Sequence, residues 1–468
     1  MQPRGDRPLI ISFRLNHLLG WFMTLIACVI PVLFWYKLNP ITNIHTLPGA
    51  MISLGRVTGL VGMVLYALNL LYATRLRFLE SMFGGLNRVY IAHHVLGGFA
   101  LIFLSLHPLF LALRLIKISL LQVTLFLLPN GLMPYGALFQ TSSPLHSQVL
   151  QQWALFFGIL AFWGMVGLLL ITFFIQIPYN IWLITHKLLG VFFIIGALHL
   201  IFITSDTSVS LPLRYYMLAI TAVGVGSYIY RLIAGKILIR HYIYAVEAVQ
   251  VVGGDVTEIT LIPTHNPLSY NAGQFIFIRF LKAQDNGLGQ EWHPFSISSG
   301  SNDAKLSIAA KGLGDYSKRL INLQPGTIAE IEGAYGKFSF VEYKNRSQIW
   351  VAGGIGITPF LSMARSLPDN SYRIDLYYSV KTASELINWN DLYNSAVSHQ
   401  GNFRIIPYIG DQQQGRLTAD LIEQMSGGLD KKDIYICGPP LMMKSLKGQF
   451  KAKSVPGTSI HTEEFAMS

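Results

Sequence analysis

The sequence His93-His94-Val95-Leu96-Gly97, followed by His107, lies inside a long apolar segment of this chain. A second apolar segment contains His186-Lys187-Leu188-Leu189-Gly190, followed by His199. Each segment therefore carries His-x-x-Leu-Gly and then another histidine, 14 residues after the first in one case and 13 in the other. At a rise of about 1.5 Å per residue, the two histidines of one helix lie ~20 Å apart along its axis.

This internal repeat predicts two levels of paired histidines in a membrane. His93 and His186 would form the inner level, and His107 and His199 the outer one. Two imidazoles at one level are what a haem iron with two axial histidines needs, whereas an unpartnered polar group inside lipid costs free energy. The alternative is that each histidine forms a hydrogen bond with a neighbouring helix.

The angular positions of the histidines add two expectations. A step of 14 residues returns to within ~40° of the same helix face, but a step of 13 leaves a difference of ~140°. The segment with His186 and His199 therefore needs a bend, a π-bulge or haems approached from different sides. The same arithmetic favours His93 over His94, which aligns with Lys187 and would face a propionate.

Hydrophobicity divides the chain into two halves. The 468 residues are 52% hydrophobic and 13% charged, with a mean hydropathy of +0.44, which excludes a disordered chain and is unusual for a soluble enzyme. We expect residues 1–236 to form a transmembrane bundle of six helices that binds haem. Six of its segments are long enough to cross ~30 Å of hydrocarbon. They are residues 18–36, 50–73, 89–113, 151–175, 181–203 and 212–234. The first has no small-residue cleavage site of a signal peptide, and a shorter stretch, Leu115–Phe126, reads as an interfacial or re-entrant piece.

The basic residues predict the orientation of this bundle. The chain has 35 Lys and Arg against 24 Asp and Glu, a formal net charge of +11. Positive charges gather before the first segment, between the second and third, and after the sixth, at Arg4, Arg7, Arg14, Arg75, Arg77, Arg88, Arg231, Lys236 and Arg240. Arg114 and Lys117 are exceptions. The positive-inside rule then places both termini and the polar half in the cytoplasm, with membrane lipid around the bundle. Topology thus accounts for the charge, and we expect no nucleic-acid partner.

Arg56 is the other costly residue of the bundle. It lies in the outer part of the second segment, where a cation needs an anionic partner or a water-filled cavity. A propionate of an outer haem would serve, and the alternative is that the side chain snorkels to the interface. The only two cysteines, Cys28 and Cys437, cannot build a disulfide framework, a CxxC zinc site or an iron–sulfur cluster.

Residues 237–345 predict a small antiparallel β-barrel, because short alternating stretches are separated by turn residues. The stretch His293-Pro294-Phe295-Ser296-Ile297-Ser298 combines an aromatic ring, a turn fixed by proline and two hydroxyls. Such a stretch could hold a planar ring and form hydrogen bonds with the edge of that ring. The stretch Lys311-Gly312-Leu313-Gly314-Asp315-Tyr316-Ser317 opens a helix. Glycines before a helix expose N–H groups to a phosphate, although helix capping without a ligand accounts for this piece equally well.

Residues 346–468 alternate strands with helices and predict a doubly wound α/β domain. A strand leads into Gly353-Gly354-Ile355-Gly356-Ile357-Thr358-Pro359, where glycines would let the backbone approach a phosphate. The last strand ends in Cys437-Gly438-Pro439-Pro440. Nucleotides bind at the carboxyl ends of the strands in such sheets. The glycine turn departs from G-x-G-x-x-G and is weak evidence by itself.

The combination of these motifs is far more specific than each motif alone. In this order they resemble the FAD and NAD(P)H module of the ferredoxin–NADP reductase type. Behind six membrane segments with paired histidines, that module looks like the NADPH oxidase and ferric reductase superfamily, over nearly the whole chain. The residues that look most like bacterial members are Leu79-Glu80, Gly85-Leu86-Asn87-Arg88, His93, Gly97 and His107-Pro108. The resemblance thus implies an integral protein of a bacterial inner membrane.

The resemblance implies roles for individual residues. His293, Pro294, Phe295, Ser296 and Ser298 would hold the isoalloxazine and ribityl part of FAD, and Lys311, Gly312, Gly314 and Ser317 its pyrophosphate. Gly353, Gly354, Gly356 and Thr358 would take the dinucleotide phosphates, and Cys437, Gly438 and Pro439 would lie beside the nicotinamide. Phe465 matches the C-terminal aromatic residue that covers the flavin, although three residues follow it here. Arg56 resembles an arginine that lies near the outer haem and oxygen in oxidases.

The resemblance also implies the path of the electrons. NADPH or NADH would give a hydride to FAD on the cytoplasmic side, and single electrons would cross through two b-type haems, the inner one between His93 and His186 and the outer one between His107 and His199. A flavin is needed because a hydride carries two electrons and a haem accepts one. Neither calcium control nor an obligatory cytosolic activator is expected.

The acceptor outside is left open between three classes. Oxygen, reduced to superoxide, and a ferric chelate are both compatible, and Arg56 favours oxygen slightly. A partner protein that receives electrons from this chain, as in a repair or maturation system, is an alternative of a different class. The choice between NADPH and NADH is also open, with Lys381 and Arg373 as the basic residues that could neutralise a 2′-phosphate.

Overall fold

The computed structural model describes residues 12–39, 44–128, 146–175, 177, 179–234, 240–281, 287–343, 345–368, 371–413 and 415–463. The chain folds as two compact units, one within residues 1–238 and one within residues 239–468. The first unit is helical and the second contains two β-sheets, so the change in composition near residue 236 coincides with a change in architecture.

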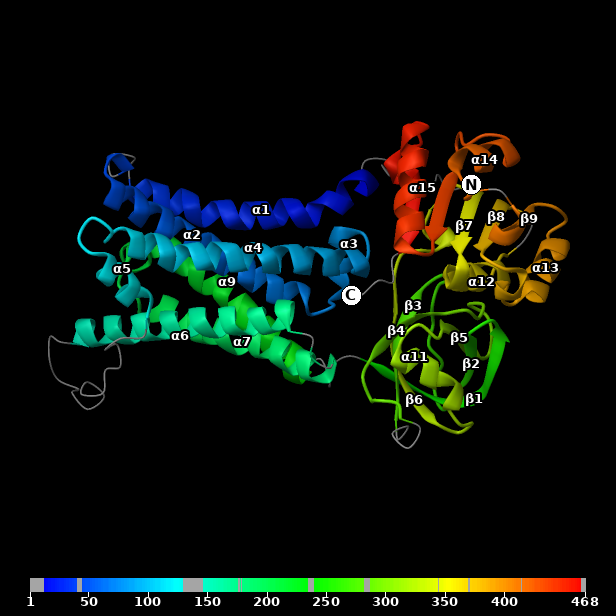
Figure 1. Ribbon diagram of the computed structural model, residues 1–468, viewed down its shortest axis with the longest axis horizontal. Helices are drawn as coiled ribbons and strands as arrows, with labels where there is room; N and C mark the ends of the chain where they lie inside the picture. The colour runs from blue at the N-terminus through cyan, green and yellow to red at the C-terminus, as the bar shows by residue number, and fades with distance from the viewer. Residues whose placement is uncertain are drawn as a thin grey trace, which may run out of the picture. The chain divides into compact units, whose positions relative to one another are not determined.

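The first unit consists of helices, most of them long (Figure 1). They are α1 (Ser12–Leu38), α2 (Leu47–Tyr72), α3 (Arg77–Phe83), α4 (Leu86–Leu113), α5 (Leu120–Leu127), α6 (His146–Phe174), α7 (Tyr179–Phe202), α8 (Asp206–Val209) and α9 (Leu211–Ile229), followed by a π-helical turn at Tyr230–Ala234. Among the described residues, six helices are long and apolar enough to span a membrane. They agree with the six predicted segments. The stretch read as interfacial forms α5, whose eight residues are too short to cross a bilayer.

Local sequence explains where the spanning helices begin. The Thr46 hydroxyl accepts a hydrogen bond from the Gly49 N–H at 3.2 Å, and a proline occupies the first turn of α2. Ser210 caps α9 in the same way, by accepting from the Leu213 N–H at 3.4 Å. Such caps satisfy N–H groups that have no partner within the helix.

Two helix pairs dominate the packing of this unit. Helix α2 lies along α4, and α6 lies along α7 (Figure 1). The backbones approach closely because glycines face bulky side chains: a Cβ built on Gly62 of α2 would lie 2.8 Å from Leu104 of α4. The Tyr66 hydroxyl links the pairs by donating to the Leu189 carbonyl of α7 at 2.6 Å.

The second unit begins with a six-stranded antiparallel sheet in the order β4-β3-β6-β1-β2-β5. Its strands are β1 (His241–Gly253), β2 (Val256–Pro263), β3 (Phe275–Phe280), β4 (His293–Ser296), β5 (Leu306–Lys311) and β6 (Ile328–Tyr335). A bridge between Ile297 and Ile308 joins the two outermost strands and closes the sheet on itself. The inward side chains, such as Ile259, Ile278 and Ile331, are fully buried and form the barrel core.

The second sheet is parallel, with the order β11-β10-β7-β8-β9. Its strands are β7 (Ser347–Gly353), β8 (Arg373–Val380), β9 (Phe403–Ile409), β10 (Asp433–Cys437) and β11 (Ile460–Glu463). The helices of the second unit are α11 (Asp315–Arg319), α12 (Thr358–Arg365), α13 (Trp389–Ser398), α14 (Ala419–Met425) and α15 (Pro440–Ala452). The predicted order of a six-helix membrane bundle, an antiparallel barrel and an α/β nucleotide-binding domain is confirmed.

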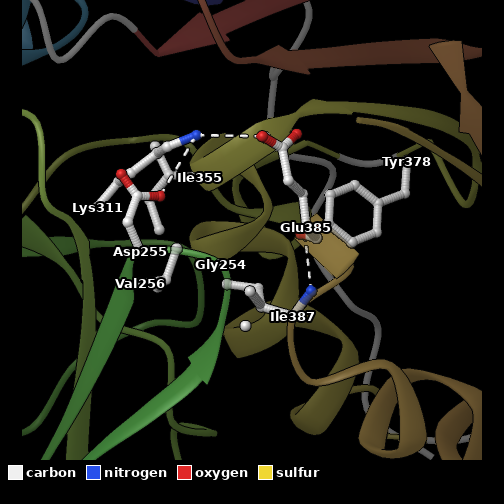
Figure 2. Close-up of a pocket in the computed structure, with 10 residues that line it drawn as sticks. Gly254, Asp255, Val256, Lys311, Ile355, Tyr378, Glu385 and Ile387 are labelled. Atoms are coloured by element: carbon white, nitrogen blue, oxygen red, sulfur yellow. Dashed lines mark hydrogen bonds and ion pairs between the residues drawn. The ribbon is translucent and has the colours of Figure 1, made fainter. Parts of the chain in front are cut away.

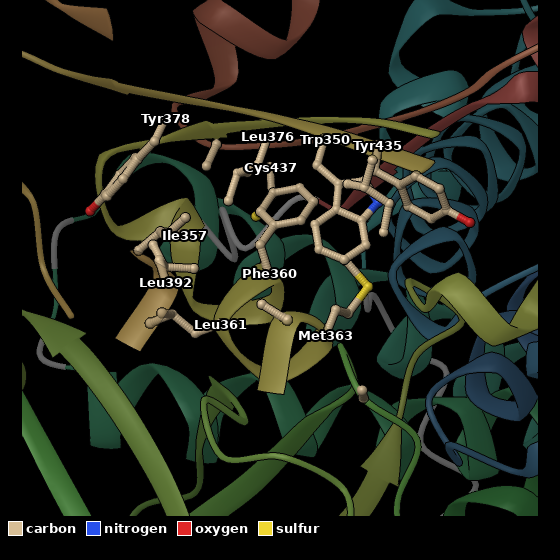
Figure 3. Close-up of a cluster of buried hydrophobic side chains, with 14 of the residues drawn as sticks. Trp350, Ile357, Phe360, Leu361, Met363, Leu376, Tyr378, Leu392, Tyr435 and Cys437 are labelled. Atoms are coloured by element: carbon tan, nitrogen blue, oxygen red, sulfur yellow. The ribbon is translucent and has the colours of Figure 1, made fainter. Parts of the chain in front are cut away.

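Alternate residues of the parallel strands enter different cores, as the period of a strand requires. Ile349, Val351 and Ile436 belong to one core, and Trp350, Ala352 and Cys437 to the other. The second core also contains Val256, Phe338 and Phe340 from the barrel. Figure 3 shows Trp350, Phe360 and Cys437 together in this core, which joins the barrel to the nucleotide-binding sheet.

Candidate functional site: two imidazole pairs and a dinucleotide edge

The four histidines predicted as ligands meet in two pairs. The ring centroids of His93 and His186 are 6.0 Å apart, and their planes differ by 73°. The rings of His107 and His199 are 6.3 Å apart, with planes at 70°. Because α4 and α7 each supply one ring to each pair, the pairs form two levels, which we call the inner pair (His93 and His186) and the outer pair (His107 and His199).

The dimensions of both pairs suit one metal ion between two imidazoles. A nitrogen–metal bond of about 2 Å on each side would place the two ring centroids ~6 Å apart. Among the residues that the structure describes, no group of three or more His, Cys, Asp or Glu could hold a metal ion. Two imidazoles with no further protein ligand are the donor set of a haem iron with two axial histidines, so the residues present fit that group.

Three of the four imidazoles are oriented by backbone carbonyls. Nδ1 of His107 lies 2.6 Å from the Gly55 carbonyl oxygen, and Nδ1 of His93 lies 3.0 Å from that of Asn69, both on α2. Nδ1 of His199 lies 2.7 Å from the Ala154 carbonyl oxygen on α6. A bond that the Nδ1–H donates leaves Nε2 for a metal and fixes the ring.

Glycines make room for the outer pair. A Cβ built on Gly59 would lie 2.5 Å from Nδ1 of His107, and one built on Gly158 would lie 2.7 Å from Nδ1 of His199. Any side chain at either position would displace an imidazole. The sequence does not single out these two glycines, because small residues are common wherever membrane helices pack closely. Each nevertheless lies four residues after the carbonyl that its histidine contacts.

The unequal spacing of the histidines is accommodated without a break. Helix α7 is α-helical from Tyr179 to Phe202, so the 13-residue step between His186 and His199 involves no π-bulge. The π-helical turn of this unit lies instead at Tyr230–Ala234. The two rings therefore leave α7 on different sides. His94 is exposed and contacts the Tyr90 carbonyl of its own helix at 2.9 Å, whereas His93 faces His186.

Arg56 has an anionic partner within the protein. Its guanidinium donates to the Asp206 carboxylate at 2.9 Å, and the Trp35 indole N–H donates to the same carboxylate at 2.8 Å. The arrangement ties α1, α2 and α8 together. The Arg56 side chain is 37% exposed and that of Asp206 is 17% exposed. The anionic partner that Arg56 needs is thus a protein carboxylate among the described residues, which the sequence did not suggest because Asp206 lies 150 residues away.

In the barrel, His293 stacks on Tyr316 with centroids 3.6 Å apart and planes at 25°. This contact brings together the two stretches predicted to hold FAD. Burial lowers the pKa of His293, although the nearby Glu291 carboxylate opposes this effect. The Ser298 hydroxyl is buried, and like the Tyr316 hydroxyl it has no hydrogen-bond partner among the described residues. Buried polar atoms of this kind are ready to bond a ligand, so the residues present fit a flavin. Phe295 packs at the rim of the barrel core, beside the buried Ser296.

The other stretch predicted to hold FAD, residues 311–317, places the ammonium of Lys311 next to Gly312. Figure 2 shows the Lys311 ammonium near the carboxylates of Asp255 and Glu385, each at 3.6 Å. The three side chains line a pocket together with Gly354, which directly follows β7. Gly312 donates its N–H to the Asp255 carbonyl.

The start of α11 is already capped by its own residues. The Gly314 N–H donates to the Ser317 hydroxyl at 3.0 Å, and that hydroxyl donates back to the Gly314 carbonyl. This stretch therefore caps the helix that follows it. A Cβ built on Gly314 would meet no atom within 4 Å, so the surface above it is open.

The glycine turn and the Cys-Gly-Pro stretch lie against each other at the carboxyl edge of the parallel sheet. A Cβ built on Gly356 would lie 2.4 Å from the Cys437 carbonyl oxygen, and one on Gly353 would lie 2.8 Å from Pro439. A Cβ on Gly438 would lie 3.0 Å from the Gly353 backbone. Thr358 begins α12 and is buried, with its hydroxyl donating to the Ile355 carbonyl at 3.1 Å. We call this region the dinucleotide edge.

Cys437 itself lies inside the protein. Its side chain is 1% exposed, and burial, aided by Glu463, raises the pKa of the thiol well above its usual range. Glu463 is its register partner on β11. Phe465, the predicted flavin cover, lies outside the described residues, which end at position 463.

Family models match three parts of the chain. Residues 58–197 match the ferric reductase like transmembrane component, residues 242–338 the FAD-binding domain, and residues 350–448 the oxidoreductase NAD-binding domain. The matched ranges include both imidazole pairs except His199, the His293 stretch and the dinucleotide edge.

Curated relatives match parts of the chain. The chain is 28% identical over 217 residues to the phenol hydroxylase P5 protein of Acinetobacter pittii. This match covers 42% of this chain and 58% of that protein. It is 33% identical over 161 residues to ferric reduction oxidase 8, mitochondrial, of Arabidopsis thaliana. This match covers 29% of this chain and 21% of that protein. The chain thus spans about half the length of the first curated relatives it matches, 58%, 42% and 55% of them.

Solved structures resemble part of the chain. A ferredoxin NADP+ reductase from Neisseria gonorrhoeae with bound FAD and NADP is 21% identical, with a TM-score of 0.41, and the match covers 48% of this chain and 98% of that one.

Proposed function

This chain has the domain architecture of the NADPH oxidase and ferric reductase superfamily, and we propose that it carries electrons from cytoplasmic NAD(P)H across a membrane to an acceptor outside. It is an NAD(P)H-dependent oxidoreductase with a transmembrane unit. The observation that carries the proposal is the pairing of four membrane histidines at 6.0 and 6.3 Å. Each pair would hold one b-type haem.

When bound, FAD would supply the conversion of a two-electron hydride into single electrons, and the haems would supply one-electron carriers within the membrane. The protein supplies position. Carbonyls of α2 and α6 would hold three of the four imidazoles in one orientation and leave Nε2 of each for a metal. The two imidazoles of each pair would be the protein ligands of its haem, and electrons would leave to an acceptor at the haem edge.

In the second unit, the stacked His293 and Tyr316 and the unpartnered Ser298 hydroxyl would bind the flavin ring and its chain. Lys311 would neutralise a phosphate, in competition with Asp255 and Glu385. The close backbone contacts at the dinucleotide edge would let NAD(P)H phosphates approach Gly354, whose surface is open. The buried Cys437 would keep a neutral thiol at the end of the nicotinamide path.

For the acceptor, the ion pair of Arg56 and Asp206 favours oxygen. A paired guanidinium adds no net charge at the outer end of α2, so an anionic ferric chelate gains little attraction there, while neutral oxygen is unaffected. Superoxide would then be the product. The likeness to a ferric reduction oxidase favours a ferric chelate as the second candidate.

For the donor, the structure separates the two basic residues. Arg373 begins β8 and Lys381 follows its last residue, so only Lys381 is at the carboxyl edge where the glycine turn lies. Arg373 is at the opposite edge of the sheet, so we do not propose it as a partner of a 2′-phosphate. Lys381 supports NADPH as the donor.

The test is an absorption spectrum of the purified protein before and after reduction with dithionite. We expect low-spin b-type bands in the wild-type protein and about half their intensity in His93→Ala and in His199→Ala. A wild-type protein without a Soret band would refute the proposal. Dismutase-sensitive superoxide formation supports oxygen, and turnover with ferric citrate but none with oxygen supports the ferric candidate.

A further inference from the structure

The imidazole of His186 is held differently from the other three. Nδ1 of His186 is buried and has no hydrogen-bond partner among the described residues, whereas Nδ1 of each of the other three rings contacts a backbone carbonyl on a neighbouring helix. A hydrogen bond of that kind fixes the orientation of an imidazole. In the inner pair, therefore, the ring of His93 is oriented by a carbonyl, and the ring of His186 needs another means of orientation.

An indole lies flat against the His186 ring. Trp182 precedes His186 by four residues on α7, and the two ring centroids are 5.0 Å apart, with planes that differ by 13°. Residues four apart are neighbours on one face of a helix. Nearly parallel rings at a centroid distance of about 4.5–7 Å form an offset stack. Rotation of the imidazole would break this flat contact, so the stack holds the ring in one orientation.

The other three imidazoles have no such contact. Among the described residues, the rings near His93, His107 and His199 stand at 70° or more to them. Phe103 lies four residues before His107 on α4, as Trp182 does before His186, yet no contact joins its ring to that imidazole in the part of the chain that the structure describes. An aromatic residue at this spacing is therefore not enough for a stack. The flat contact occurs at the one imidazole that lacks a carbonyl.

We infer that Trp182 is a positioning residue for His186, and that its indole does by stacking what a backbone carbonyl does for each of the other three imidazoles. The inference rests on the proposed haem ligation and adds a residue to it. Trp182 acts only through His186. It keeps the planes of the inner pair near the angle of 73° that they have in the structure.

Electron paramagnetic resonance of the ferric protein tests this role. The g values of a low-spin ferric haem depend on the angle between the planes of its two axial imidazoles, so they report the orientation of the His186 ring. In His199→Ala, a haem with two imidazole ligands can form only at the inner pair. In that background, Trp182→Leu keeps an apolar side chain without a ring and should shift or broaden the low-spin signal. Trp182→Phe should retain the parental signal, because a phenyl ring can stack in the same way.

Retention of haem gives a second readout. A stacked pair of rings changes an equilibrium constant by roughly 2–10-fold. The inner haem of Trp182→Leu should therefore pass to excess apomyoglobin about 2–10-fold faster than that of the parent or of Trp182→Phe. Phe103→Leu in the His93→Ala background is the matched control. It removes an aromatic ring from the equivalent position beside the outer pair, where no stack is present, and should change neither the signal nor the rate of haem loss.

The outer haem shows whether a variant is folded. In the chain with all four histidines, Trp182→Leu should change the inner low-spin signal and leave the outer one as it is. If Trp182→Leu binds neither haem, Trp182→Met takes its place, since methionine fills similar space without a ring. An inner signal and a rate of haem loss equal to those of Trp182→Phe, in whichever of these two variants folds, would overturn the inference. A wild-type protein that binds no haem would overturn the proposed function instead.

Discussion

The imidazole of His199 occupies the space that a side chain on Gly158 would need. A Cβ built on this glycine would come within 2.7 Å of Nδ1 and 3.0 Å of Cε1 of the ring. The glycine and the histidine are on different helices, α6 and α7, so the outer pair depends on a contact that no local sequence pattern reveals.

Substitution of Gly158 by alanine should therefore release the outer haem. The displaced His199 would lose its contact with the Ala154 carbonyl, and loss of such a bond typically lowers metal affinity about 10–100-fold. We expect the reduced b-type absorption per protein to fall toward half. Gly167→Ala is the matched control. Gly167 lies on the same helix, and a Cβ built there meets no atom within 4 Å. Full absorption in both variants would contradict the assignment.

Neutralisation of Asp206 should alter the choice of acceptor. In Asp206→Asn, Arg56 keeps its charge and loses its counter-ion, so anions are attracted to the outer end of α2. Steady-state rates should show a several-fold rise in kcat/KM for ferric citrate and little change for oxygen. The conservative Asp206→Glu should behave like the parent. An equal change for both acceptors would mean that the pair has only a structural role.

Alanine at Gly356 should destabilise the dinucleotide edge. The new methyl group would clash with the Cys437 backbone carbonyl, and overpacking of this kind typically costs about 1–3 kcal/mol. We expect a lower unfolding temperature of the second unit together with a higher KM for NAD(P)H. Gly448→Ala in α15 meets no atom within 4 Å and should leave both quantities near the parental values or raise stability slightly.

Acidic pH should weaken the barrel through His293. Burial lowers the pKa of this group below the value of about 6.5 that it has in an unfolded chain. The unfolded state therefore binds more protons as the pH falls through 6.5, and stability declines with it. Thermal unfolding followed by flavin fluorescence should show this decline, and His293→Gln should reduce it. An unchanged slope in the variant would assign the pH dependence to another group.

Lys381 and Arg373 should differ in their effect on NADPH. Lys381→Ala is expected to raise KM for NADPH several-fold with little effect on NADH, because the side chain follows the strand end nearest the glycine turn. Arg373→Ala, at the opposite edge of the sheet, should leave the ratio of the two constants unchanged. The reverse result would show that the nucleotide extends in the other direction.

Hydropathy and motif order were enough to predict the six spanning helices, the barrel and the parallel sheet, because each depends on a period or composition that is local in sequence. The pairing of His93 with His186 was also predictable, since two similar repeats place their histidines at equal depth. The partners of these residues were not. Asp206 opposite Arg56, Tyr316 against His293 and Gly158 beneath His199 are contacts between distant segments, and nothing at either position marks the other.

The distribution of the imidazoles over the helix pairs has a consequence for biogenesis. The α2–α4 pair and the α6–α7 pair each contribute one ring to each level. Neither helix pair alone therefore supplies both histidines of a level. On the proposed ligation, haem can be bound stably only after both helix pairs have inserted and packed together. Acquisition of the Soret band during synthesis would then mark a late step in assembly, and chains arrested before α7 emerges should remain colourless.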